Sequence, residues 1–567
     1  MPLKLAYAAL DTDHEKLRQR FTNLHDYYQE WRLEALEAQA YVDCDYEIVR
    51  PPDTPGIIPP TAATKIETAV VELITDSPKV RKRKPGQKEN EQRDADAMEA
   101  ALQNCLKESE EYLQSPWLHE AAKLQMTRGS AILAGPFYNK EQGVCWLDTF
   151  DPLTVYIEPG PMPREAFIHL KMTYAELEQI ADDEQFDAQR KDQSLTREVE
   201  IVRWYCVPKE KGMSGMTALW KKGDSDFLVE PKPSGYPYLP MDCVLSGWGR
   251  RTMGAKPEEM AVGLLNRGVR SVLRAEAQMF TIMDSAASQA TWNRYRLPPG
   301  VELALGFKIE TTPNSITRDV PEQLQPFEQV PLPRSVTQHM ALLEQYIEAA
   351  TFSSVLSGQR QPGVGTATGL QILTGRGRRK FYPPMRLLQA GVARMLYKVG
   401  LLAEFLESAG TPDLEWRGTK LKAEMFHDGD FSITVDLLSE DEEQRRVKIA
   451  EGASLQGSVP EQIIYEEFFG MENYSEAFRL KLRDSILNSE QFLNSVLQDF
   501  TAKAGMPPPQ PKGANPEGAP PGPGAGMDRI ARLYQAASGT QLPPQPGSVE
   551  AGQQVVNQPR VLPQVAG

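Results

Sequence analysis

The sequence predicts an α+β fold in which helices predominate. Apolar residues recur with the 3.6-residue period of amphipathic helices over 13–40 and again over much of 257–500. Between about 143 and 245 the sequence pattern changes to short runs of β-branched and aromatic residues separated by turns, which is typical of β-strands. A chain of 567 residues is also too long for one simple core, so we expect several subdomains.

The composition is that of a globular protein, with 41% hydrophobic and 25% charged residues. A net charge of −15 argues against a protein that coats nucleic acid through a basic face, although nucleic acid could still pass through it. No apolar run approaches the ~20 residues of a membrane span, and the N-terminus lacks a signal-peptide core. We therefore expect no membrane contact, and a protein that is made and used inside a cell or a particle assembled there.

The cysteines and histidines give no sign of a catalytic or metal site. The five cysteines have no CxxC pair and no ligand spacing, which predicts reduced and mostly buried thiols. The six histidines include no HExxH pair, and no GxSxG motif is present. We expect no catalytic residues, no metal and no cofactor, and hence a protein that is not an enzyme. The cysteines are Cys44, Cys105, Cys145, Cys206 and Cys243.

The N-terminal part of the chain is predicted to be mostly helical. After the helix over 13–40, the prolines of 50–60 predict an extended arm. Further helices are expected over 64–75, 89–113 and 115–134, the last capped by Ser115. The basic run 81–84 is interpreted as a solvated loop beside an acidic helix rather than as a nucleic-acid segment.

Two long helices, predicted over 257–284 and 335–356, bracket a small insert with β-forming residues. They predict a helical hairpin with a cap at its far end, whose apolar faces cannot all be covered within the hairpin. Neighbouring subunits would cover them. Arg267, Arg270 and Arg274 share one face of the first helix at spacings of three and four, and we take them as candidate inter-subunit residues.

The segment after the second helix is rich in glycine and threonine and then basic. Gly363–Gly369 superficially matches a phosphate-binding loop, but Leu370-Gln371 stand where that loop requires Lys-Ser or Lys-Thr. We interpret it as a mobile loop. The cluster Arg376, Arg378, Arg379 and Lys380 fits two readings equally well, contact with phosphates or pairing with carboxylates of the same chain.

The C-terminal part begins with a striped helix over 385–407 and a strand over 431–438. Helices are then expected over 439–456 and 460–500. The final stretch is rich in proline, glycine and glutamine, which predicts disorder.

The order of these pieces resembles the portal proteins of tailed bacteriophages over about residues 15–500. Three stretches carry the resemblance: 149–159, which contains DPLTVYIEP; 357–379, with its glycines, threonines and basic run; and 451–483, which is similar to a portal crown. The resemblance implies a portal fold with an α/β wing, a two-helix stem, a β-containing clip, a tunnel loop with its helix, and a helical crown. The Pro/Gly-rich tail is not a general portal feature.

The resemblance also implies a division of the chain into segments. These are an N-terminal helix and arm (1–60), the wing (61–256), the first stem helix (257–284), the clip (285–334), the second stem helix (335–356), the tunnel loop with its long helix and a returning wing strand (357–438), the crown (439–502) and the tail (503–567).

The resemblance implies a ring at one capsid vertex of the virion, assembled in the host cytoplasm, and twelve copies are expected in it. Double-stranded DNA would pass through it. Expected partners are the terminase large subunit, the major capsid and scaffolding proteins, and head–tail adaptor proteins. Two alternatives stay open: another structural virion protein such as an adaptor or scaffold-associated protein, and a packaging or nucleic-acid enzyme. The candidate tunnel-loop and DNA-channel residues are Gly363, Gly365, Thr366, Thr368, Gly369, Arg376, Arg378, Arg379 and Lys380.

Overall fold

The structure is a computed structural model, and the chain divides into two compact units, 1–439 and 440–567. The described residues are 6–50, 56–74, 78–82, 89–180, 194–224, 226–252, 254–291, 295–296, 325–326, 334–353, 356, 377–410, 413–422, 433–437 and Gly452. The predicted crown apart from Gly452, the tail, the loop 357–376 and most of the insert 292–333 therefore lie outside the described residues. So do Gly363, Gly365, Thr366, Thr368, Gly369 and Arg376.

The N-terminal helix is confirmed, but it divides at Tyr28 into α1 (His14–Tyr27) and α2 (Gln29–Val42). The Asp13 side chain begins α1 by accepting a hydrogen bond from the Glu15 N–H. Helix α1 then lays Leu17 and Phe21 on a five-stranded antiparallel sheet of order β4-β5-β6-β7-β8. The strands are β4 (Val155–Ile157), β5 (Glu165–Thr173), β6 (Glu198–Cys206), β7 (Met216–Lys221) and β8 (Phe227–Pro233), with the short helix α6 (Tyr174–Glu178) after β5.

A second sheet has the order β3-β2-β9, with β2 (Ser130–Asn139) in the middle, β3 (Val144–Phe150) and β9 (Met241–Leu245). The prediction of a helix over 115–134 was wrong at both ends. Helix α5 (Trp117–Arg128) has Pro116 rather than Ser115 at its N-cap, and it stops at Gly129, whose φ of 79° lies in the left-handed region. The five residues after Gly129 pair with β9, and most are buried.

Helix α12 (Tyr382–Ser408) packs against this second sheet and confirms the helix expected over 385–407. The six apolar residues of its predicted stripe are all buried: Leu388, Val392, Met395, Val399, Leu402 and Leu406. Gly391 lets the helix approach closely, because a Cβ there would lie 2.4 Å from Cγ2 of Val244. The helix begins one turn earlier than expected, since Pro383 and Pro384 occupy its first turn, where no N–H is needed.

Two helices, a pair of strands and a small β-hairpin complete the described body of the first unit. Helix α3 (Thr61–Leu73) and helix α4 (Glu89–Leu113) agree with the predicted helices over 64–75 and 89–113. Strand β1 (Lys79–Lys82) pairs antiparallel with β14 (Ile433–Asp436), so part of the basic run expected to be a loop is a strand. A small hairpin of β12 (Leu414–Trp416) and β13 (Thr419–Leu421) packs against α4.

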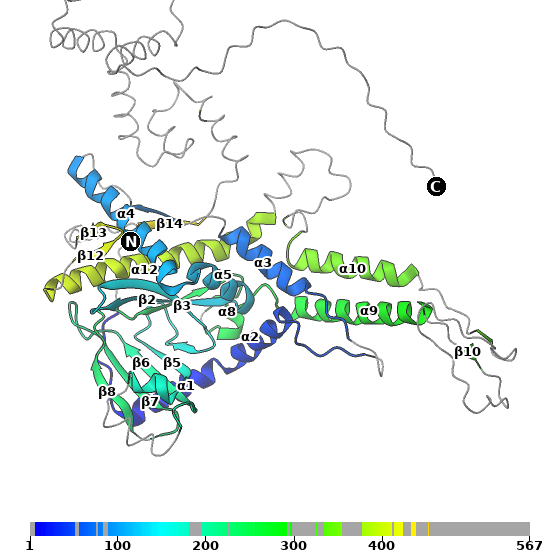
Figure 1. Cartoon of the computed structure of the whole chain (residues 1–567), viewed down its shortest axis with the longest axis horizontal. Coiled ribbons are helices and arrows are strands. Elements are labelled where there is room, and N and C mark those ends of the chain that lie inside the picture. Colours follow the sequence, from blue (N-terminus) through cyan, green and yellow to red (C-terminus); the bar gives the residue numbers. More distant parts are fainter. Residues whose placement is uncertain are drawn as a thin grey trace, which may run out of the picture. The chain divides into compact units, whose positions relative to one another are not determined.

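The predicted pair of long helices is present, with one correction. The helix expected over 257–284 is two helices, α8 (Pro257–Met260) and α9 (Arg267–Thr291), and the second helix is α10 (Arg334–Ala350). Helices α9 and α10 lie side by side and point away from the two sheets (Figure 1). At 1.5 Å per residue α9 is about 37 Å long. The backbone of the insert has a short antiparallel pair, β10 (Tyr295–Arg296) with β11 (Gln325–Pro326). We call α9 and α10 together the hairpin.

Candidate functional site at the base of the hairpin

The turn before α9 fixes the base of the hairpin to the C-terminal end of α5. The N–H of Leu264 donates to the carbonyl oxygen of Met126 at 2.7 Å. A Cβ at Gly263 would lie 2.4 Å from the carbonyl oxygen of Thr127, so only glycine allows the two segments to approach this closely. Oδ1 of Asn266 accepts a hydrogen bond from the N–H of Val269 at 3.2 Å and satisfies one of the free donors at the start of α9.

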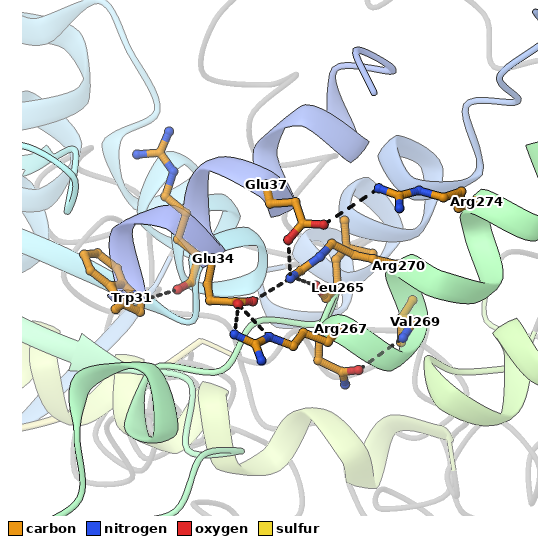
Figure 2. Close-up of polar contacts among 10 residues, drawn as sticks. Trp31, Glu34, Glu37, Leu265, Arg267, Val269, Arg270 and Arg274 are labelled. Carbon is orange, nitrogen blue, oxygen red and sulfur yellow. Dashed lines mark hydrogen bonds and ion pairs between the residues drawn. The ribbon is translucent and has the colours of Figure 1, made fainter. Parts of the chain in front are cut away.

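Arg270 is the centre of the contacts between α9 and α2 (Figure 2). Only 4% of this residue is exposed. Its guanidinium donates to the carbonyl oxygen of Leu265 at 2.9 Å and to carboxylate oxygens of Glu34 and, at 2.9 Å, Glu37. A buried charge that lost such partners would be strongly unfavourable, so this group holds the start of α9 on α2.

Arg267 and Arg274 lie on either side of Arg270 along α9 and contact the same two carboxylates. Nε of Arg267 donates to Glu34 at 2.6 Å, and the guanidinium of Arg274 lies 4.0 Å from Glu37 and 5.9 Å from the centre of the Tyr41 ring. The three arginines predicted to contact a neighbouring subunit thus all have carboxylate partners within the chain. Arg270 is buried with its partners inside the chain, whereas Arg267 and Arg274 are partly exposed, and their contact with another copy stays a prediction.

Arg267 and Arg270 stabilise the charged form of the Glu34 carboxylate. Burial by itself would raise the pKa of Glu34, but hydrogen bonds from Arg267 and Arg270 outweigh it and hold the pKa below its usual value. The cluster contains three arginines and two glutamates, so its net charge is positive.

A second set of contacts ties the hairpin to α3. Glu276 on α9 is buried, and Oε1 accepts a hydrogen bond from the Thr61 hydroxyl at 3.3 Å. Burial raises the pKa of Glu276, and the neighbouring carboxylate of Glu344 on α10 adds to this effect. Lys65 on α3 donates to the carbonyl oxygen of Phe352 at 3.2 Å and lies 4.6 Å from the centre of its ring. The hairpin is therefore anchored from α2 on one side and from α3 on the other.

Two residues of the predicted basic cluster, Arg378 and Lys380, have partners within the chain. Nε of Arg378 donates to Glu72 of α3 at 2.7 Å, and the Lys380 ammonium donates to the carbonyl oxygen of Ala350 at the end of α10. Burial lowers the pKa of Lys380. Of the two readings left open by the sequence, pairing with a carboxylate thus holds for Arg378. Arg379 is exposed, and for it contact with phosphates stays a prediction.

The contacts described at the base of the hairpin are hydrogen bonds and ion pairs. Among the described residues no group of three or more histidine, cysteine or acidic side chains is arranged to hold a metal ion. None of the helices in the described part of the chain combines the length and apolar character of a membrane span. Cys105, Cys145 and Cys206 are buried as expected, and Cys44 and Cys243 are partly exposed. What the geometry does is fix the orientation of a long helical hairpin on a mixed α/β body.

Comparison with known proteins does not assign the chain to a family. No family model matches the sequence, and no curated protein matches it either.

Sequence reasoning found the three arginines but missed their partners, Glu34 and Glu37. Both carboxylates lie on the predicted first helix, yet they are separated from Arg270 by 236 and 233 residues. The available signal was the acidic face of that helix, which has no basic residues at the i+4 positions of Glu34 and Glu37.

Proposed function

We propose that this chain is a subunit of a ring-shaped portal of a tailed bacteriophage, through which double-stranded DNA enters and leaves the capsid. The observation that carries the proposal is the hairpin, with large apolar side chains on its surface. Phe280 and Ile282 of α9 are 36% and 46% exposed, and Leu342 and Tyr346 of α10 are 47% and 60% exposed. The hairpin is anchored at one end and has exposed apolar side chains along its sides. Hairpins of adjacent copies would cover these side chains.

The order of elements along the chain supports the same proposal. A mixed α/β body is followed by one long helix, a segment with a short β pair, a second long helix, and then a long helix that packs back on the body. This is the order of wing, stem, clip, stem and tunnel helix expected for portals. Contacts repeated head to tail by a fixed rotation close into a ring, and a ring of such hairpins encloses a channel.

The charge of the chain fits a channel that does not hold DNA. At −15 per copy, a wall built from several copies repels phosphates on average, while exposed cations such as Arg379 give weak and exchangeable contacts. The chain has no nucleotide-binding loop in its sequence, so the packaging motor, a terminase large subunit, would be a separate partner. The proposed protein is a structural component and not an enzyme, and its other partners are the capsid, scaffolding and head–tail adaptor proteins.

Negative-stain electron microscopy of the purified full-length protein tests the proposal, with rotational symmetry analysis of end-on views. We expect closed rings of about twelve subunits around an open channel. Monomers or irregular solid particles at every protein concentration would contradict the proposal and favour an adaptor or scaffold-associated protein.

A further inference from the structure

The loop between β9 and α8 is fixed on the start of α12. A Cβ at Gly247 would lie 2.9 Å from Cδ1 of Leu387 and 3.2 Å from Cβ of Pro383, so the loop and the helix are in close contact at this glycine. Nε1 of Trp248 donates a hydrogen bond to the carbonyl oxygen of Lys380 at 3.1 Å, just before α12 begins. The two segments therefore form one surface, although the bonded residues are 132 positions apart in the sequence.

Four exposed arginines lie on the two segments of this surface, and we call them the basic patch. Arg250 and Arg251 belong to the loop, Arg379 lies just before α12, and Arg386 lies on the second turn of that helix. Arg250 follows Gly247 by three residues, and three residues span at most about 10 Å. The cations of the loop thus lie close to the point where the loop contacts α12.

The arginines of the basic patch differ from those at the base of the hairpin, which have carboxylate partners. Within the described part of the chain, none of the four patch side chains forms an ion pair or a hydrogen bond. The carboxylates of the neighbouring helix α8 contact Lys256 instead, since Glu258 lies 3.8 Å from its ammonium and Glu259 accepts its backbone N–H at 3.4 Å. The paired arginines at the base are Arg267, Arg270, Arg274 and Arg378.

The basic patch lies where the chain enters and leaves the hairpin. The loop precedes α8 and α9, and the Lys380 ammonium beside Arg379 donates to the carbonyl oxygen of Ala350 at the end of α10. In the proposed ring the hairpins surround the DNA, so exposed cations at their base would lie beside its path.

Phosphates of a duplex are the chemical partner that fits this patch. The planar guanidinium of arginine matches two phosphate oxygens at once and is more weakly hydrated than an ammonium. A DNA duplex carries one negative charge per roughly 1.7 Å of its axis, so cations spread over about 10 Å face several phosphates together. The chain as a whole has a net charge of −15, and the basic patch is a local exception to it.

We propose that the basic patch contacts the phosphates of double-stranded DNA as the duplex passes the base of the hairpins. This inference rests on the proposed function. It extends the DNA contacts to Arg250, Arg251 and Arg386, which the sequence did not indicate. Such contacts do not depend on the base sequence, because they are made to the backbone of the duplex.

Binding of a labelled duplex over a series of salt concentrations tests the inference, with fluorescence anisotropy as the measurement. A loop variant carries Arg250→Gln and Arg251→Gln, and a helix variant carries Arg379→Gln and Arg386→Gln. Each variant removes two positive charges from one of the two segments that form the surface.

A matched control carries Arg18→Gln and Arg197→Gln, which removes the same charge at two exposed positions outside the basic patch. Circular dichroism verifies that each variant folds, and mass photometry with negative-stain electron microscopy measures whether it forms rings.

The wild type and the control are expected to bind the duplex with the same dependence on salt. Each phosphate contact contributes roughly 0.9 to the slope of log K against the logarithm of the salt concentration, so the loop variant and the helix variant should each lower this slope by about 1.8. Rings of either variant with the slope of the wild type would overturn the inference and leave the proposed portal intact.

Other outcomes separate the occupants of the surface. Wild-type rings that bind poly-L-glutamate but not the duplex would indicate an acidic protein as the partner and would overturn the inference. Loss of rings in the loop and helix variants, but not in the control, would show that the patch is a contact between copies and would overturn it as well. A wild type that never forms rings would instead contradict the proposed function, and with it the inference.

Discussion

The two parts of the hairpin are stabilised in different ways. Near the body, α9 buries Val269, Leu273 and Ala277 and forms ion pairs with α2 through its arginines. Farther along, Phe280 and Ile282 are exposed on the same helix. The base of the hairpin thus has its contacts within the described part of the chain, whereas farther along α9 has apolar side chains that no described residue covers.

This contrast separates two roles of one helix. The base transmits the orientation of the body to the hairpin, because buried charged contacts tolerate little displacement. In the proposed ring, the exposed part would supply contacts to neighbours without affecting the fold of the single chain. Substitutions in the base should therefore change the stability of the monomer, and substitutions in the exposed part should change assembly.

The largest effect is expected from Arg270→Ala. Removal of the guanidinium leaves Glu34 and Glu37 without their buried partner, and breaking a buried pair in this way costs about 3–5 kcal/mol of unfolding free energy. Urea denaturation of the dilute monomer measures the change. A loss below about 1 kcal/mol would show that the ion pairs do not hold the base.

A smaller loss of unfolding free energy is expected when a buried apolar side chain in the base of the hairpin is truncated, and almost none when an exposed one farther along α9 is truncated. Leu273→Ala empties a buried position and should lower the unfolding free energy by about 2–4 kcal/mol. Ile282→Ala changes an exposed side chain on the same helix and should alter monomer stability by less than about 0.5 kcal/mol while weakening assembly. If the two substitutions lowered the unfolding free energy of the monomer equally, the proposed difference between the base and the exposed part of the hairpin would be wrong.

The pH dependence of the base gives a third test. The pKa of Glu276 is raised in the folded state, mainly by burial and further by Glu344, with the Thr61 hydrogen bond and Lys65 acting against the shift. The folded state then binds more protons than the unfolded state, so this group lowers stability as pH rises above its unfolded pKa. Glu276→Gln should stabilise the protein at pH 8, and this gain should shrink as pH falls toward 4.5.

The gain is measured by comparing melting temperatures of the two proteins across this pH range. A Glu276→Gln variant that is less stable than the wild type at pH 8 would mean that the charged carboxylate has partners outside the described residues.

The smallest effect is expected from Arg267→Ala. The Arg267 side chain is 77% exposed, although it contacts Glu34, and ion pairs of exposed side chains contribute little to stability. Denaturation at low and high salt should show a small loss that is screened by salt. If Arg267→Ala lowered the unfolding free energy as much as Arg270→Ala, the difference in exposure between the two arginines would not determine their contributions to stability.

The sequence predicted the hairpin and the helix over 385–407 because their apolar residues repeat with a clear helical period. It failed at the boundary between α5 and β2. Ala131, Leu133 and Ala134 favour a helix locally, but pairing with β9 on one side and β3 on the other overrides this preference. Strand β2 was missed, since its first seven residues are all buried and lack the alternation of a half-exposed strand. Strands β8 and β9 lie within 143–245, where short β runs were expected.

The candidate site was predicted only in part, for a related reason. The spacing of Arg267, Arg270 and Arg274 places them on one face of a helix, and the structure confirms this. Which carboxylates face them depends on how α2 crosses α9, and this is decided by the packing of residues more than 200 positions apart. Local patterns contain no information about such a contact.

The most direct test of the account is hydroxyl-radical footprinting of the hairpin in assembled and dilute protein. Phe280, Leu342 and Tyr346 are exposed in the single chain, so we predict that they are oxidised in the dilute monomer and strongly protected in the assembly. Tyr382, which is 44% exposed at the start of α12, provides a comparison on the body. Equal oxidation of the three hairpin residues in both states would contradict a ring whose subunits meet along the hairpin.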